Sequence, residues 1–190
     1  MFLKFAAKLF TILFLPLVAC QLPGGQVVQP IQQVSETTDL HFETLVKDHN
    51  AKLYDERDDY HHATYLSLDL FIALNIEEAQ GVAGVLNPDM ANLHLADIDE
   101  VDFAKKFVIV AYYGRAPNGS YAIAIEKIQQ SDNLVDVFVS TMEPSGGDTG
   151  VTRPIHIVTS DKENLINRGE LTFRMWKDNE IVVQHNHFVP

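Results

Sequence analysis

The chain has 190 residues and a formal net charge of −12 at neutral pH, with 26 acidic side chains against 14 basic ones. This excess of negative charge repels phosphate backbones, so it argues against nucleic acid as a partner and against electrostatic docking on anionic lipid. The length suits one domain with its own core, and the single cysteine excludes a disulfide within the chain.

The N-terminal residues predict an export signal that ends at a cysteine. Lys4 and Lys8 accompany a short apolar run, Leu9–Leu17, which is well below the roughly 20 residues of a membrane-spanning helix. The sequence Leu-Val-Ala-Cys ends at Cys20 and resembles a bacterial lipobox, in which the cysteine thiol receives lipid. We therefore predict a lipoprotein signal peptide over residues 1–19 and lipidation of Cys20. The alternative is an ordinary signal peptide with an incidental cysteine.

Lipidation would place the protein in the bacterial cell envelope, anchored to the membrane on its extracytoplasmic side by the acyl chains. Residues 20–38 are rich in Gln, Pro, Gly, Ser and Thr and poor in large apolar residues, which is typical of a tether. From Asp39 onward no comparable linker and no repeat recurs, so residues 39–190 are interpreted as a single domain.

The folded part is predicted to be a strand-dominated α+β domain, with a compact, mostly antiparallel, sandwich-like sheet and one or two helices. Alternating or continuous apolar runs indicate strands over residues 40–46, 65–70, 107–113, 121–126, 135–139, 155–157, 171–176 and 181–185. Asn75, the acidic residues that follow it, and Asn87-Pro88 predict a helix over Ile76–Leu86. Residues 177–180 are expected to connect a closing hairpin.

The run Phe107–Tyr113 is apolar on both alternating faces, which is typical of a central strand covered on both sides. The residues after it supply Pro, Asn and Gly for a reversal, and a strand resumes at Tyr121. We therefore expect the two strands to pair as a hairpin. Gly119 in this turn can adopt a positive φ without steric cost.

A longer pattern extends from Val101 to Val158. Its elements are Asp102-Phe103, the apolar strand Phe107–Val110, Gly114-Arg115-Ala116-Pro117, Tyr121-Ala122-Ile123, the loop at Pro144, and Pro154-Ile155-His156-Ile157-Val158. Together they resemble the C-terminal domain of the PrcB family of protease-complex subunits. The chain departs from the family at the turn, which reads Asn-Gly-Ser-Tyr instead of Thr-Gly-Gly-Tyr, and at Ile155, where the family has an aromatic residue.

The resemblance implies an exported, often lipid-modified accessory protein that binds or stabilises a protein partner, with a protease as the precedent, and it implies no catalytic residue. The candidate partner-binding turn consists of Pro117, Asn118, Gly119, Ser120 and Tyr121. The amphipathic ring of Tyr121 can pack over the adjoining strand or contact a partner, and both interpretations stay open.

No residue set predicts catalysis, a metal or a cofactor. His185 and His187 would share one face of a strand, but no third ligand is identifiable. The acidic runs 55–59 and 97–100 do not match a calcium-loop spacing. No serine lies in a nucleophile elbow, although His156 follows Ser120 along the chain. We therefore predict a binding protein without a cofactor rather than an enzyme.

The sequence thus favours a membrane-anchored accessory protein that assembles with or stabilises another exported protein, with a protease as the family precedent. Two alternatives stay open: a protease inhibitor that acts through the Gly-rich turn before Tyr121, and an enzyme or metal-dependent ligand binder. An enzyme should show a deep pocket with convergent polar groups, whereas a binding protein should show a flat or edge-strand surface with exposed apolar residues.

Overall fold

The computed structural model of the protein describes residues 36–48, 67–86, 97–117, 119–145 and 152–190. These residues belong to the unit Val34–Pro190, one of the two into which the chain divides. Several predicted features lie outside the described residues: the signal peptide over residues 1–19, Cys20, the tether up to residue 35, the acidic run 55–59, and Asn118 of the predicted turn.

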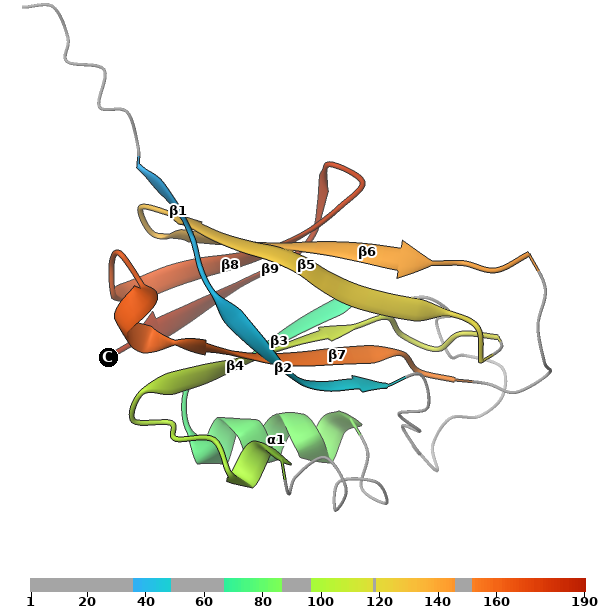
Figure 1. Ribbon diagram of the computed structural model, residues 1–190, viewed down its shortest axis with the longest axis horizontal. Coiled ribbons are helices and arrows are strands. Elements are labelled where there is room, and N and C mark those ends of the chain that lie inside the picture. The colour runs from blue at the N-terminus through green and yellow to red at the C-terminus, as the bar shows by residue number, and fades with distance from the viewer. Residues whose placement is uncertain (1–35, 49–66, 87–96, 118, 146–151) are drawn as a thin grey trace, which may run out of the picture. The chain divides into compact units, whose positions relative to one another are not determined.

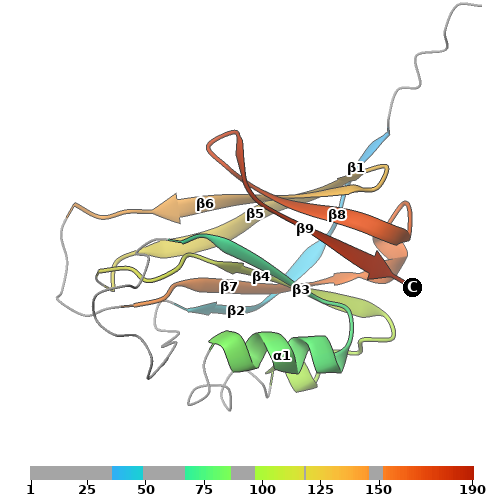
Figure 2. The same cartoon turned by 180° about the vertical axis from the view of Figure 1, so that it is seen from behind.

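The described residues form two sheets, which confirms the strand-dominated α+β class. Sheet A has the order β1-β5-β6-β8-β9, with bounds Thr37–Asp39, Ala122–Ser131, Leu134–Met142, Gly169–Lys177 and Glu180–Val189. Sheet B has the order β2-β7-β4-β3, with bounds Phe42–Asp48, Ile155–Asp161, Lys106–Tyr112 and Asp69–Ala73. The two sheets are stacked, and helix α1 (Ile76–Leu86) lies on the far side of sheet B (Figures 1 and 2). A 3-10 helix, η1 (Lys162–Asn164), follows β7.

The strand pairs of the described residues are antiparallel, except for β6 and β8, which run parallel. Strand β1 begins at Thr37, so sheet A includes the last two residues of the predicted tether. The parallel pair arises because β7 and η1 intervene between β6 and β8 and carry the chain through sheet B before it returns to sheet A.

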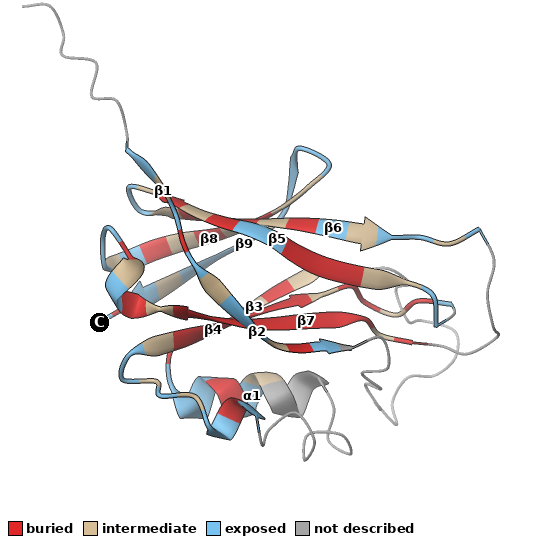
Figure 3. Ribbon diagram, viewed as in Figure 1, coloured by how far each residue is buried: buried red, intermediate tan, exposed pale blue. Residues whose placement is uncertain are grey.

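Buried apolar residues form two cores, one between the sheets and one between sheet B and α1. Figure 3 shows the buried residues in red along the strands of both sheets. Phe107 of β4 and Phe173 of β8 meet edge to face between the sheets, with ring centroids 6.2 Å apart. On the other face of β4, Val108 and Val110 belong to the core that includes Ala79 of α1. Strand β4 therefore contributes to both cores, which confirms that it is the central strand predicted from its two apolar faces.

Helix α1 has the predicted bounds, and its first turn is stabilised by local hydrogen bonds. The Glu78 N–H donates to the Asn75 Oδ1 at 2.9 Å, and the Leu74 N–H donates to the Glu78 Oε2 at 2.7 Å. This reciprocal pattern is that of a capping box, displaced by one residue at the Leu74 end. Within the described part of the chain, no helix has the length and apolarity needed to cross a membrane.

The predicted hairpin between the strand at 107–113 and the strand at 121–126 is wrong. Strand β4 lies between β3 and β7 in sheet B, whereas β5 lies between β1 and β6 in sheet A. Each strand finds its antiparallel partners elsewhere in the chain, and their apolar residues, such as Ile109 and Ile123, share the core between the sheets. The connection therefore crosses from one sheet to the other.

The glycine that this crossing requires is Gly114 rather than Gly119. Gly114 has φ 87°, and a Cβ added there would lie 2.5 Å from the Ser67 backbone nitrogen. Gly119 does not have a positive φ, and a Cβ added there would meet only the Thr152 Cγ2, at 3.7 Å. The Ser67 backbone lies so close to Gly114 that a side chain would not fit there, and glycine also adopts the positive φ without steric cost. The connection therefore requires glycine at its start.

The closing hairpin is confirmed. Strands β8 and β9 are joined by a two-residue turn, Asp178-Asn179, whose φ angles are 52° and 65°. Positive φ at both central residues is the signature of a type I′ turn, and Asp and Asn tolerate it better than other non-glycine residues. A bulge at residues 181–183 interrupts the ladder, and the pairing is regular from Val183 to Val189.

Candidate functional site

The outer faces of the two sheets differ in what covers them. The outer face of sheet B is covered by α1 and by residues 97–103, through buried side chains such as Ala79 and Ile98. No described helix lies over the outer face of sheet A (Figures 1 and 2). We take this outer face of sheet A, at its β6, β8 and β9 strands, as the candidate functional site.

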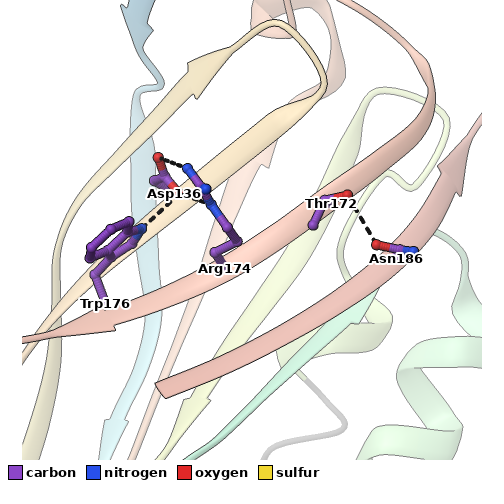
Figure 4. A network of polar contacts seen from close by, with 5 residues as sticks. All are labelled: Asp136, Thr172, Arg174, Trp176 and Asn186. Atoms are coloured by element: carbon purple, nitrogen blue, oxygen red, sulfur yellow. Dashed lines mark hydrogen bonds and ion pairs between the residues drawn. The ribbon is translucent and has the colours of Figure 1, made fainter. Parts of the chain in front are cut away.

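A polar network organises the centre of this face (Figure 4). Arg174 of β8 donates from its Nε and Nη2 atoms to the two carboxylate oxygens of Asp136 on β6, at 2.6 Å and 2.7 Å. The Trp176 Nε1–H donates to the same Asp136 Oδ1 at 2.7 Å. The side chains of Arg174 and Asp136 are only 19% and 16% exposed. A bidentate pair that is this well shielded from solvent is geometrically specific, unlike an ordinary surface ion pair.

The network holds an aromatic pair in place. The Trp176 ring is stacked on the Phe138 ring, with centroids 6.1 Å apart and an interplanar angle of 19°. The Arg174 guanidinium lies 5.5 Å from the centroid of the Trp176 ring, within cation–π range. The Asp136 carboxylate already accepts three hydrogen bonds, so its role here is to orient Arg174 and Trp176.

Exposed apolar side chains extend the aromatic pair toward the edge of the sheet. Phe138, Trp176 and Ile181 are directly opposite one another on β6, β8 and β9. Ile181 is 44% exposed, Val182 beside it 40%, and Phe188 near the end of β9 70%. Trp and Phe residues with exposed aliphatic neighbours are typical of the surfaces by which proteins bind one another.

The predicted turn lies apart from this row but is connected to it. Pro117, Gly119 and Ser120 are exposed, and the Tyr121 ring is half-buried, 5.7 Å from the Tyr113 ring. The Tyr113 hydroxyl donates to the Glu143 carboxylate at 2.8 Å, and that carboxylate also lies 3.4 Å from the Lys177 Nζ, next to Trp176. Burial, and then the hydrogen bond to Glu143, raises the pKa of Tyr113, while that bond lowers the pKa of Glu143.

His156 is buried between the sheets and joins three strands. Its Nδ1 accepts a hydrogen bond from the Ile125 N–H at 2.8 Å, so its Nε2 carries the proton and donates to the Thr44 Oγ1 at 2.9 Å. Burial, reinforced by the positive charge of Lys47, lowers the pKa of His156 to about 4. A neutral ring with both nitrogens engaged acts as a structural link between the sheets.

His185 and His187 both lie on β9, opposite the buried Phe173 and Leu171. The His185 Nε2 is 3.3 Å from the Asp69 Oδ1, and the His187 ring packs edge-on against Phe173 with centroids 5.7 Å apart. Burial lowers the pKa of His187. Among the residues that the structure describes, no group of three His, Cys, Asp or Glu side chains could hold a metal ion.

Two open hollows of the described surface have charged side chains in their linings. One of about 370 Å³ lies between β2 and residues 97–102, where Glu43 is paired with Lys106 at 2.6 Å. Another, of about 490 Å³, lies at the crossing from β1 to β2, beside Lys127. The nearly buried Lys162 donates its Nζ protons to the Leu74 and Phe103 carbonyls at 3.0 Å and 2.8 Å, so it ties these loops together.

The outer face of sheet A was not predicted from the sequence. Asp136 stands between Val135 and Val137, and Arg174 between Phe173 and Met175, so alternation does mark these polar residues as facing away from the core. Their partnership depends on the parallel pairing of β6 with β8, which local sequence does not reveal.

Neither protein-family models, nor curated proteins, nor solved structures gave a match to this chain.

Proposed function

We propose that this protein is a lipid-anchored accessory protein of the bacterial cell envelope, which binds another exported protein and assembles with or stabilises it. Acylated Cys20 would supply the membrane attachment, and the resemblance to PrcB suggests a protease as the partner. The proposal assigns no catalytic residue and no cofactor to the chain.

The main support for the proposal is the outer face of sheet A, which presents an ordered aromatic and aliphatic row that no described helix covers. The bidentate Arg174–Asp136 pair fixes Trp176 before any partner arrives, so little side-chain entropy would be lost on binding. Tryptophan and arginine are also the residues that most often dominate the energy of protein interfaces.

The experiment uses the full chain in its own membranes and a matched pair of substitutions. Ile181 lies on the candidate face and is 44% exposed, whereas Ile166 lies after η1 and is 43% exposed. We expect Ile181→Lys to reduce the amount of co-purified exported partner about tenfold, the effect of 1.4 kcal/mol, and Ile166→Lys to leave it unchanged. Equal recovery with both variants would contradict the assignment of this face.

Deletion of the chain distinguishes a protein that stabilises its partner from one that inhibits it. If the partner is a protease that the protein stabilises, deletion of the chain lowers the level or maturation of that protease. An increase in protease activity after deletion would instead show that the chain is an inhibitor.

A further inference from the structure

Strand β9 forms one edge of sheet A, and its side away from β8, here called the open side, has no strand neighbour among the described residues. It has ten residues, Glu180–Val189, and its described strand neighbour is β8 alone. An edge strand presents main-chain N–H and C=O groups that can pair with an added strand.

The hydrogen bonds of β8 show which residues of β9 face the open side. The Thr172 N–H donates to the Asn133 carbonyl, next to β6, at 2.8 Å, so it points away from β9. Thr172 and its opposite residue Asn186 therefore form a non-hydrogen-bonded pair, in agreement with the 3.0 Å contact between their side chains. Because the two kinds of pair alternate along an antiparallel ladder, the main-chain groups of Gln184, Asn186 and Phe188 point outward.

The other sheet edges among the described strands are shorter than β9 or interrupted within their ladder. Strands β1 and β3 have three and five residues, and β2 carries a bulge in the middle of its ladder together with Glu43 and Lys47, whereas the bulge of β9 lies next to its turn. Strand β9 has no charged residue after Glu180 and exposes Phe188. Proteins usually place charges, prolines or bulges on long edge strands to prevent unwanted pairing. The regular stretch from Val183 to Val189 has none of these, which is typical of an edge strand that accepts a strand from a partner.

The charged side chains around β9 indicate which kind of segment could pair with it. The acidic groups that face this edge from neighbouring elements are Asp69, which contacts His185, Glu78, which acts on the His187 ring, and Glu170, opposite Phe188. Two basic residues of β8 also lie beside β9, Arg174 opposite Gln184 and Lys177 opposite Glu180 at the turn. The Arg174 guanidinium is engaged by the Asp136 carboxylate, so the charges left to act along Val183–Val189 are acidic. Strand β9 itself contributes Glu180 and no Lys or Arg. A second copy would bring the same carboxylates and a net charge of −12 against them, whereas a segment with Lys or Arg residues would complement them.

We propose that β9 is the docking edge for an extended, basic segment of the partner protein, which pairs with the main chain of Gln184, Asn186 and Phe188 and adds a strand to sheet A. This inference rests on the proposed function and deepens it by assigning the chemistry of the bound segment.

The test compares Asn186→Pro with Asn186→Ala in the full chain. Both variants lose the side-chain contact to Thr172, but only proline removes the outward N–H, and it leaves the ladder to β8 without a missing bond. The probe is a synthetic peptide of β9 length in which Val and Lys alternate, and the matched peptide has Glu in place of Lys. The readout is amide hydrogen exchange along β9, with the thermal midpoint as a check of folding.

We expect the Lys peptide to slow amide exchange at positions 184, 186 and 188 at least about tenfold in the wild type and in Asn186→Ala. In Asn186→Pro, which has no amide proton at position 186, the peptide should leave exchange at Gln184 and Phe188 unchanged. If Asn186→Pro unfolds, Gln184→Pro against Gln184→Ala makes the same comparison. Protection that survives both proline substitutions, or equal protection by the Glu peptide, would overturn the proposal. A dimer that the proline variants abolish would show that a second copy takes this edge, which would also overturn it.

Failure of this inference differs from failure of the proposed function. If only strand addition is wrong, the natural partner still co-purifies with Asn186→Pro while Ile181→Lys loses it. If the proposed function is wrong, no exported protein depends on Ile181 at all.

Discussion

The His156 ring accepts a hydrogen bond from the Ile125 N–H at 2.8 Å, so a residue of sheet B satisfies a main-chain donor of sheet A. Strand β1 pairs with β5 only over residues 129–131, and the ladder between β5 and β6 is irregular between Ile125 and Lys127. The imidazole thus takes the place of a strand neighbour at an irregular position. Protonation of His156 would put a second donor against the Ile125 N–H and break this link.

The first prediction concerns stability below neutral pH. The pKa of His156 is about 4 in the folded state against 6.5 in the unfolded chain, so the unfolded state binds more protons between these values. The free energy of unfolding should be constant above pH 6.5 with respect to this group and fall by up to about 3 kcal/mol by pH 4. Denaturant titrations at several pH values measure this slope.

The control for this prediction is a set of glutamine substitutions. His156→Gln should flatten the slope, and the exposed His41→Gln should leave it unchanged. The half-buried His187 contributes in the same direction, so part of the slope should remain in His156→Gln and decrease further in the double variant with His187→Gln. An unchanged slope in His156→Gln would contradict the structural role of this ring.

The second prediction concerns the network on the outer face. Asp136→Asn or Arg174→Met leaves the other partner poorly compensated at a largely shielded position, so each should lower the free energy of unfolding by about 1 to 3 kcal/mol. A double-mutant cycle should give a favourable coupling between the two. Lys106→Met, which breaks the exposed pair with Glu43, should leave the unfolding midpoint unchanged. Additive effects at Asp136 and Arg174 would show that the pair is not coupled.

The third prediction ranks the loss of stability that alanine causes at three glycine positions. Gly114→Ala should destabilise the protein by on the order of 1 to 3 kcal/mol or more, because positive φ and a backbone clash with Ser67 coincide there. Gly169→Ala, with φ 95° and open space for a Cβ, should cost less. Gly119→Ala should be close to neutral, since it has neither strain nor a clash. Thermal unfolding of the three variants should rank them in this order, and a larger loss at Gly119 than at Gly114 would refute it.

The fourth prediction concerns the anchor. Cys20→Ser removes the thiol that lipidation requires, so we expect the protein to leave the membrane fraction or to remain unprocessed. Mass spectrometry of the mature N-terminus is the direct check. An unmodified mature N-terminus at another residue in the wild type would contradict lipidation at Cys20.

Local signals predicted the parts of the fold that local interactions stabilise. Asn75 and Glu78 act within one helical turn, so they fixed the start of α1 correctly. The Asp178-Asn179 turn closes its own hairpin, and its residues indicate it directly. The two apolar faces of Phe107–Tyr112 likewise predicted a strand between two cores.

These local signals do not predict which strands pair when the strands are distant in the chain. The turn residues around Gly119 are equally compatible with a hairpin and with a crossing between sheets, and the choice depends on β3, β7 and β6, which lie elsewhere in the chain. The same reason hid the candidate site, because Arg174 meets Asp136 only once β8 has returned beside β6.

Site-specific photo-crosslinking in native membranes shows directly whether an exported protein binds the outer face and edge of sheet A. A photoreactive side chain at position 181 or 188 lies on the exposed part of β9, and one at Glu77 lies on the exposed side of α1 over sheet B. We expect positions 181 and 188 both to crosslink to the same exported protein and position 77 not to crosslink to it. Crosslinking to that protein from position 77 alone, or equally from all three positions, would contradict binding through the outer face and edge of sheet A.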